Sequence, residues 1–224
     1  IHEGLEPLLG LLLRRTVRAT FFVPGVTAER YPEAVRRISD AGHEIASHGY
    51  AHLPVTALDR EAERNELLGG IDALEAVTGT RPTAWRSASW EWSEHSLDLA
   101  LDAGVTVSTN FQDRSRPYRH RREGRELPLV ELPVHWHLAD APYFLYGGLP
   151  GRAIRAATTA RQVWMEEFLG LYDDRPGSFF HLTLHVQLIG HPGRLRMLDS
   201  VLAEIAGKPR TRFVTSSELA ATVD

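Results

Sequence analysis

Two histidines four positions apart form the clearest candidate site in the sequence. His48 and His52 follow directly after a predicted strand at 43–47. Two imidazoles at this spacing can face one point when the segment is helical or turn-like, and neutral imidazole is a good ligand for zinc and related divalent ions. Gly49 stands where the zinc metalloprotease pattern has a glutamate, so the pair does not indicate peptidase chemistry. The alternative is a chance spacing in a chain with eleven histidines.

His185 and Arg86 are further candidates, because each lies at the C-terminal end of a predicted strand. In the strand 179–185, alternation puts His181 and His185 on one side. His185, at the strand end, could act as a general acid or base, whereas His181 is predicted to be a hydrogen-bonded core residue. Arg86 could hold a carboxylate in a fork of hydrogen bonds, and the alternative is a solvated charge at the rim of the domain.

An aromatic segment at 134–144 is a candidate substrate contact. It contains Trp136 and Tyr143, and flat apolar side chains of this kind suit a sugar or another ring-shaped substrate. The alternative is a hydrophobic plug that closes one end of a barrel.

Strands and helices alternate along the chain, and this order predicts how the candidate residues are positioned. The pattern indicates an α/β fold with a mainly parallel sheet and helices outside it. No glycine-rich phosphate loop follows the first strand, so a closed barrel is favoured over an open dinucleotide-binding sheet. In such barrels the chemistry lies at the C-terminal ends of the strands. The predicted strands are 19–23, 43–47, 83–87, 105–109, 129–134, 179–185 and 212–215; the predicted helices are 5–13, one from about Tyr31, one that Thr56 and Asp59 open as a capping box, 93–103, 151–171 and 192–206.

Composition and charge exclude several classes of protein. The 224 residues suit one α/β domain spanning 1–224. A net charge of −4 without long runs of one sign gives no reason to expect nucleic acid as a partner. The chain has no cysteine, so a metal must bind His, Asp or Glu. No apolar stretch approaches the roughly 20 residues of a membrane span, so we expect none.

Four segments of the chain have the composition and the order of family motifs, at 19–23, 41–52, 86–90 and 182–185. Together they resemble the polysaccharide deacetylase family, also called the NodB-homology or carbohydrate esterase family four, over nearly the whole chain. This resemblance implies a distorted seven-stranded (β/α) barrel.

The same resemblance implies a role for each candidate residue. His48 and His52 would bind one divalent metal ion, with zinc as the expected metal, and His185 would protonate the leaving amine. Arg86 would orient a carboxylate that acts as the catalytic base. The backbone N–H of Ser89 would face the developing oxyanion. The expected substrate contacts are Trp90, Trp136 and Tyr143.

Further segments resemble one branch of the family. Residues 131–136 with 142–144, and 185–190 with 192–194, are most similar to the branch that contains a Helicobacter-type peptidoglycan deacetylase, uric-acid-independent allantoinases and cyclic imide hydrolases. This likeness implies a homo-oligomer without a secretion signal, and hence a cytoplasmic protein.

Two features depart from the family pattern. The acidic pair of the first motif, which would end the first strand, has no counterpart in the sequence. We therefore expect the domain to be N-terminally incomplete and to lack its first strand, a metal-binding carboxylate and the catalytic base. In addition, Ala88 stands where the third motif normally has proline.

The sequence thus predicts a metal-dependent hydrolase of amide bonds that deacetylates an N-acetylated polysaccharide such as peptidoglycan or chitin. One alternative is an allantoinase or cyclic imide hydrolase of the same fold, with a small cyclic amide as substrate. An alternative of another class is a non-catalytic, carbohydrate-binding degenerate barrel.

Overall fold

The computed structural model describes residues 3–146, 153–175 and 177–223, and the chain divides into two compact units. The sheet unit comprises Arg18–Pro133 and Val214–Asp224, and the helical unit comprises Ile1–Val17 and Val134–Phe213. The single domain expected over 1–224 stays a prediction.

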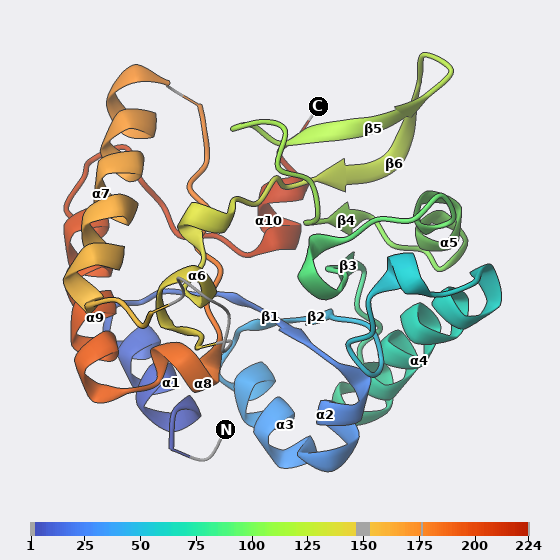
Figure 1. Cartoon of the computed structure of the whole chain (residues 1–224), viewed down its shortest axis with the longest axis horizontal. Coiled ribbons are helices and arrows are strands. Elements are labelled where there is room, and N and C mark those ends of the chain that lie inside the picture. The colour runs from blue at the N-terminus through green and yellow to red at the C-terminus, as the bar shows by residue number, and fades with distance from the viewer. Residues whose placement is uncertain (1–2, 147–152, 176, 224) are drawn as a thin grey trace. The chain divides into compact units, whose positions relative to one another are not determined.

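The sheet unit is built on a six-stranded sheet in the order β1-β2-β3-β4-β6-β5 (Figure 1). Neighbouring strands from β1 to β6 pair in parallel, and β5 pairs with β6 antiparallel. This mixed sheet confirms the α/β class. Among the described residues the sheet has six strands, with β1 and β5 at the two ends of the strand order, as expected for a seven-stranded barrel that lacks its first strand. The strands are β1 (Thr20–Val23), β2 (Glu44–Ser47), β3 (Ala84–Trp85), β4 (Val107–Ser108), β5 (Tyr118–Arg122) and β6 (Arg125–Glu131).

The parallel ladder fixes which residues emerge at the C-terminal edge of the sheet. The backbone N–H of His48 donates to the carbonyl of Val23 (3.1 Å), and that of Arg86 donates to the carbonyl of Ser47 (2.9 Å). The same pattern continues with Thr109, which donates to Trp85 (3.2 Å). Each of these residues directly follows a strand. Because the sequence predicts that the chemistry lies at strand ends, we look for the functional site at this edge of the sheet.

Strand β5 is an element that the sequence analysis missed. Three arginines within Tyr118–Arg122 obscure the alternation of apolar and polar residues that normally indicates a strand. Glu123 and Gly124 connect β5 to β6, and both have positive φ (50° and 79°). This is the backbone of a two-residue hairpin turn, which matches the twist of the flanking strands.

Helices pack on the sheet unit through a buried apolar core. Leu67 and Ile71 of α4 pack in one buried cluster with Trp85 and Leu129. Asp59 caps α4, because its side chain accepts a hydrogen bond from the backbone N–H of Ala62 (2.8 Å). The predicted capping box is therefore wrong, because the N-cap is Asp59 and not Thr56, whose hydroxyl instead contacts the side chain of Glu91. The helices are α2 (Gly25–Arg30), α3 (Pro32–Asp40), α4 (Arg60–Thr78), α5 (Ser96–Asp102) and α10 (Ser216–Ala220).

Gly70 allows α4 to approach the loop after β2 very closely. A Cβ atom on Gly70 would lie 2.3 Å from the carbonyl oxygen of Gly49 and 3.0 Å from Ser47 Oγ. Glycine in a helix interior normally destabilises the helix. Here the missing side chain is what lets the helix contact the backbone of residues 47–49.

The helical unit contains α1 and the helices after residue 134. Leu5, Leu8, Leu9 and Leu12 form one buried face of α1, which confirms the helix predicted at 5–13. Helix α7 packs against α9, and α1 also packs against α9 (Figure 1). The helices are α1 (Leu5–Arg14), α6 (Ala141–Phe144), α7 (Ala157–Asp174), α8 (Val186–Ile189) and α9 (Pro192–Ala206). The predicted helix 151–171 starts later than expected, and its residues 151 and 152 lie outside the described residues.

Two predicted strands are wrong. Residues 179–185 form only one parallel bridge, between Ala139 and Thr183. The partner segment bends into a 3-10 helix at Trp136–Leu138, so a longer ladder has no straight strand to pair with. Residues 212–215 are irregular, and Thr215 instead caps α10 with a capping box.

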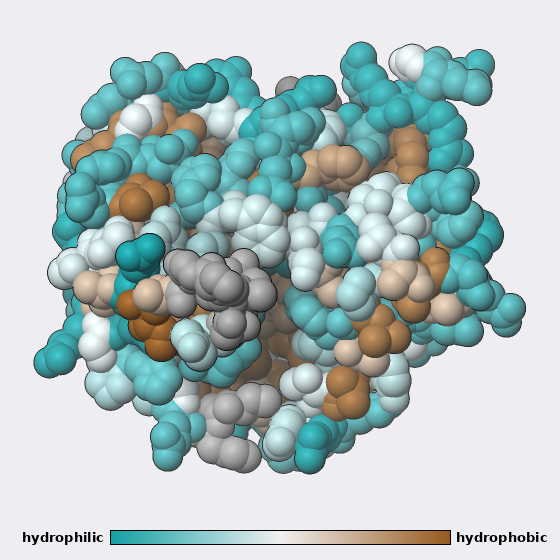
Figure 2. Space-filling model, in the orientation of Figure 1, coloured by the Kyte–Doolittle hydropathy of each residue, from teal (hydrophilic) through white to brown (hydrophobic). Residues whose placement is uncertain are grey.

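The face of the molecule in Figure 2 is mainly hydrophilic. Within the described residues, no helix combines the length and the apolar character that crossing a bilayer requires.

Replacement of Gly70 by alanine tests the close packing of α4. We expect Gly70→Ala to lower the free energy of unfolding by about 1–3 kcal/mol, because the added methyl overpacks against Gly49. Gly170→Ala in α7 is the matched control, since a Cβ there meets nothing within 4 Å. It should raise the free energy of unfolding by about 0.5–1 kcal/mol. Urea denaturation of both variants measures this, and a Gly70→Ala variant as stable as the wild type would contradict the packing.

Candidate functional site

His48 and His52 lie together, as the sequence predicts. Their ring centroids are 4.6 Å apart, and the rings meet edge to face with an interplanar angle of 85°. His48 Nδ1 lies 2.8 Å from the carbonyl oxygen of Arg86. Because a carbonyl only accepts, Nδ1 must carry the proton, and Nε2 of the neutral ring keeps its lone pair for a ligand.

The two imidazoles fit a divalent ion of the zinc class in donor type. Across residues 3–146, 153–175 and 177–223, no group of three or more His, Cys, Asp or Glu side chains is arranged to hold a metal. The described part of the chain therefore brings together at most two such side chains as possible metal donors. His52 has a left-handed backbone (φ 61°), which costs an ordinary residue about 1–2 kcal/mol, so its surroundings must hold the loop.

Arg86 is buried, unlike the solvated rim charge that was its alternative reading. Its Nε donates to Thr109 Oγ1 (2.7 Å), and its guanidinium lies 4.2 Å from the centre of the Phe22 ring. Burial lowers the pKa of the Arg86 guanidinium to about 9, and the nearby charge of Glu131 opposes this shift. Desolvation that strong makes a carboxylate contact more favourable for Arg86 than it would be in water.

Ser89 and Trp90 follow Arg86 in an unusual loop. Both have left-handed backbone angles (φ 54° and 60°), a costly conformation for residues other than glycine. Trp90 is only 9% exposed, so its indole anchors the loop and leaves little surface for a substrate. The predicted substrate contact at Trp90 stays a prediction.

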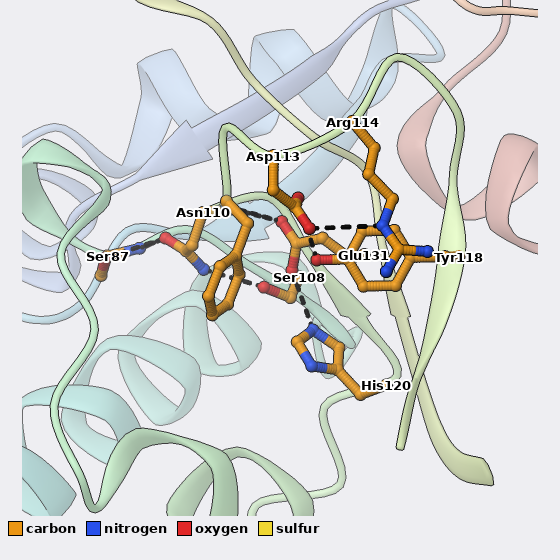
Figure 3. A network of polar contacts seen from close by, with 9 residues as sticks. Ser87, Ser108, Asn110, Asp113, Arg114, Tyr118, His120 and Glu131 are labelled. Atoms are coloured by element: carbon orange, nitrogen blue, oxygen red, sulfur yellow. Dashed lines mark hydrogen bonds and ion pairs between the residues drawn. The ribbon is translucent and has the colours of Figure 1, made fainter.

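Asn110 holds this loop from a neighbouring strand end (Figure 3). Asn110 Oδ1 accepts the backbone N–H of Ser87 and lies 2.8 Å from Ser87 Oγ. The Ser87 hydroxyl also contacts the carbonyl of Glu91. Since the hydroxyl has one proton, it donates to one of these two oxygens at a time. The Asn110 side chain and Ser87 together close the loop that contains Ser89.

Glu131 in turn fixes Asn110, and the sequence analysis gave it no role. Its carboxylate is buried and accepts the backbone N–H groups of Asn110 (2.6 Å) and Phe111 (2.9 Å). His120 Nε2 lies 3.1 Å from its second oxygen (Figure 3). The position of Glu131 at the end of β6 was the signal that could have identified it.

In the helical unit, His185 pairs with a buried carboxylate. His185 Nδ1 lies 2.7 Å from Asp140 Oδ1, and the backbone N–H of His185 donates to Asp140 Oδ2 (2.9 Å). Asp140 is fully buried, whereas the His185 side chain is 38% exposed. The carboxylate holds Nδ1–H and leaves Nε2 for chemistry. Sequence reasoning missed Asp140, because it lies in an apolar aromatic segment. His181 is half-buried, with its ring 5.8 Å from that of Phe179.

Trp136 and Tyr143, the other predicted substrate contacts, also belong to the helical unit. Trp136 is 43% exposed. Tyr143 donates its hydroxyl to the carbonyl of His137 (3.0 Å), and its ring meets Trp164 edge to face. Burial raises the pKa of the Tyr143 hydroxyl, so Tyr143 stays a neutral hydrogen-bonding group at neutral pH. The other predicted site residues belong to the sheet unit, namely His48, His52, Arg86, Ser89 and Trp90.

Comparison with known proteins identifies relatives along nearly the whole chain. The family model described as polysaccharide deacetylase matches residues 2–108. A peptidoglycan deacetylase of Helicobacter pylori is 27% identical, over 97% of this chain and 82% of its own length. The crystal structure of a putative polysaccharide deacetylase from Mycobacterium smegmatis is 36% identical, with a TM-score of 0.89, over 97% of this chain and 76% of that one. The crystal structure of Puue allantoinase has a TM-score of 0.87 at 23% identity, over 97% of this chain and 71% of that one, and shows the same fold.

Asn110→Ala tests the bonds that hold the Ser89 loop. The substitution leaves the buried backbone N–H of Ser87 without its acceptor, so we expect the free energy of unfolding to fall by about 1–3 kcal/mol. Gln112→Ala, at an exposed position two residues away, should change it by less than about 0.5 kcal/mol. Chemical denaturation measures both, and equal stability of the two variants would contradict the role given to Asn110.

Proposed function

Because the chain belongs to the polysaccharide deacetylase family, we propose that it removes acetyl groups from an N-acetylated polysaccharide such as peptidoglycan or chitin. Its homologues are hydrolases that act on amide bonds other than peptide bonds. The observation that carries the proposal is the His48–His52 pair, in which the hydrogen bond from His48 Nδ1 to the Arg86 carbonyl makes Nε2 the unprotonated nitrogen of the neutral ring, the form of imidazole that binds metals.

The proposal assigns one divalent metal ion, zinc, to His48 and His52. Enzymes of this family are generally metal-dependent, and the donor set here suits that class of ion. A divalent ion bound there would polarise the amide carbonyl and lower the pKa of a water molecule. The two imidazoles would hold the ion, with the tautomer of His48 fixed by the Arg86 carbonyl.

His185 is the proposed general acid. With both ring nitrogens protonated, Nδ1–H would donate to Asp140, and Nε2–H would give its proton to the departing nitrogen, which leaves the neutral ring protonated at Nδ1. Asp140 would keep the ring in one tautomer and one orientation, as a buried carboxylate does for a catalytic histidine. The support for this role is the resemblance of the segment 182–185 together with the Asp140 pair.

Arg86 and Ser89 are the proposed electrostatic elements. Arg86 would orient the carboxylate that acts as base, for which the sequence has no counterpart. The backbone N–H of Ser89 would donate to the oxyanion, a role that needs a preorganised donor. The hydrogen bonds from Ser87 to Asn110 supply that preorganisation. Trp136 and Tyr143 are the proposed contacts for sugar rings.

His185→Ala tests the proposed reaction. With N-acetylated chito-oligosaccharide or peptidoglycan and added zinc, the full-length protein should release acetate, and His185→Ala should lower kcat by about 10²–10⁴-fold. His191→Ala, an exposed histidine whose side chain makes no capping bond, should retain activity. Wild-type binding of oligosaccharide without acetate release would indicate a binding module, and ring opening of allantoin or a cyclic imide would indicate the alternative substrate class.

Asp140→Asn tests how His185 is oriented. The amide matches the shape of the carboxylate but can offer N–H to the ring, so part of the His185 population takes the wrong tautomer. We expect kcat to fall by about 10–100-fold, while KM changes little, because Asp140 is buried and does not contact substrate. Steady-state kinetics measure both parameters, and an unchanged kcat would remove Asp140 from the proposed mechanism.

A further inference from the structure

We propose that Glu66 is a positioning residue that sets the metal-binding geometry of His52. The inference rests on the proposed function, because it takes His48 and His52 as the metal ligands. Glu66 lies on α4, the α-helix that follows the loop containing both histidines. The residue is 7% exposed.

The carboxylate of Glu66 binds the backbone on both sides of His52. The N–H of Ala51 donates to Glu66 Oε1 (2.9 Å) and Oε2 (3.0 Å). The N–H of Leu53 donates to Oε1 (3.1 Å). His52 therefore lies between two amides that share one acceptor, and its backbone angles cannot change without breaking one of these bonds.

The restraint from Glu66 acts on His52, whose backbone conformation is otherwise unfavourable. The φ of His52 is 61°, in a region that residues other than glycine rarely occupy. Without a restraint the residue would relax to a common backbone conformation, and its Cα–Cβ bond would point in another direction. Metal–nitrogen distances tolerate changes of only about 0.2 Å. The Glu66 bonds thus hold the imidazole of His52 where it can share an ion with His48.

The surrounding glycines make room for the carboxylate. A Cβ on Gly49 would lie 2.6 Å from Glu66 Oε1. Gly70, one turn after Glu66 on α4, brings the helix against the backbone of Gly49. The positions of Gly49, Glu66 and Gly70 are therefore explained together, as the parts of one contact between α4 and the loop of His52.

Glu63 provides a matched control on the same helix. It lies one turn before Glu66, is 1% exposed, and accepts hydrogen bonds from the hydroxyl groups of Ser93 and Ser96. Its partners precede or begin α5 and do not belong to the loop of His52. Loss of either carboxylate removes acceptors from a buried site, but only loss of Glu66 should disturb the metal ligand.

Glu66→Gln and Glu63→Gln, compared by Co²⁺ titration, test the inference. A glutamine keeps one acceptor oxygen, and its NH₂ group opposes the N–H of Ala51 if it takes the place of Oε2, or the N–H groups of both Ala51 and Leu53 if it takes the place of Oε1. We expect Glu66→Gln to weaken Co²⁺ binding by about 10-fold or more, the range seen when groups that orient metal ligands are lost. Glu63→Gln should bind within about threefold of the wild type, even where both variants unfold at lower urea concentration. The visible absorption of bound Co²⁺ reports the ligand geometry directly.

Glu66→Asp is the second variant, for use if Glu66→Gln does not fold. It keeps the carboxylate but shortens the side chain, so it cannot reach both Ala51 and Leu53, and it should also bind Co²⁺ more weakly. Equal affinities of the Glu66 and Glu63 variants would overturn the role of Glu66 while leaving the metal site intact. Absence of Co²⁺ binding by the wild type would overturn the metal site itself, and the inference with it.

Discussion

Beyond the first residue of the loops after the parallel strands, several backbone amides have no strand to pair with, and buried side chains accept their hydrogen bonds instead. Buried N–H groups need acceptors, because an unpaired one costs about 1–3 kcal/mol. Glu66 accepts from the loop after β2, Asn110 from the loop after β3, and Glu131 from the loop after β4. The loops after β2 and β3 contain residues with left-handed backbone, at His52, Ser89 and Trp90. The acceptors thus decide which way the candidate functional side chains point.

His48 and His185 each bond to the protein through Nδ1, although the proposal gives the two rings different functions. His48 engages a backbone carbonyl through Nδ1, and His185 engages the carboxylate of Asp140 through Nδ1. In each case Nδ1 is the ring nitrogen that bonds to the protein, and the proposed function falls to Nε2. The proposal gives Nε2 of His48 to a metal ion and Nε2 of His185 to proton transfer. A ring held at one nitrogen loses little further freedom when it binds or reacts, and this preorganisation is a general requirement of such sites.

Residues close in sequence to strand ends were predictable, and their long-range partners were not. His48 and Arg86 follow apolar runs that read as strands, so their place at the sheet edge could be predicted. The strand β5 was hidden by its arginines, and 179–185 looked like a strand although its neighbour turns away at Trp136. Glu66, Asn110 and Asp140 act on residues 13–45 positions away. Periodicity says nothing about such contacts, because they depend on how the elements pack.

The metal content of the purified protein, measured by elemental mass spectrometry after growth in zinc, tests the central proposal most directly. If His48 and His52 hold the metal, the wild type should contain close to one zinc per chain, and His48→Ala and His52→Ala should each lose it. His95→Ala, a histidine beside the start of α5, should retain it. Zinc retained in both the His48 and His52 variants, or a wild type without metal, would contradict the site.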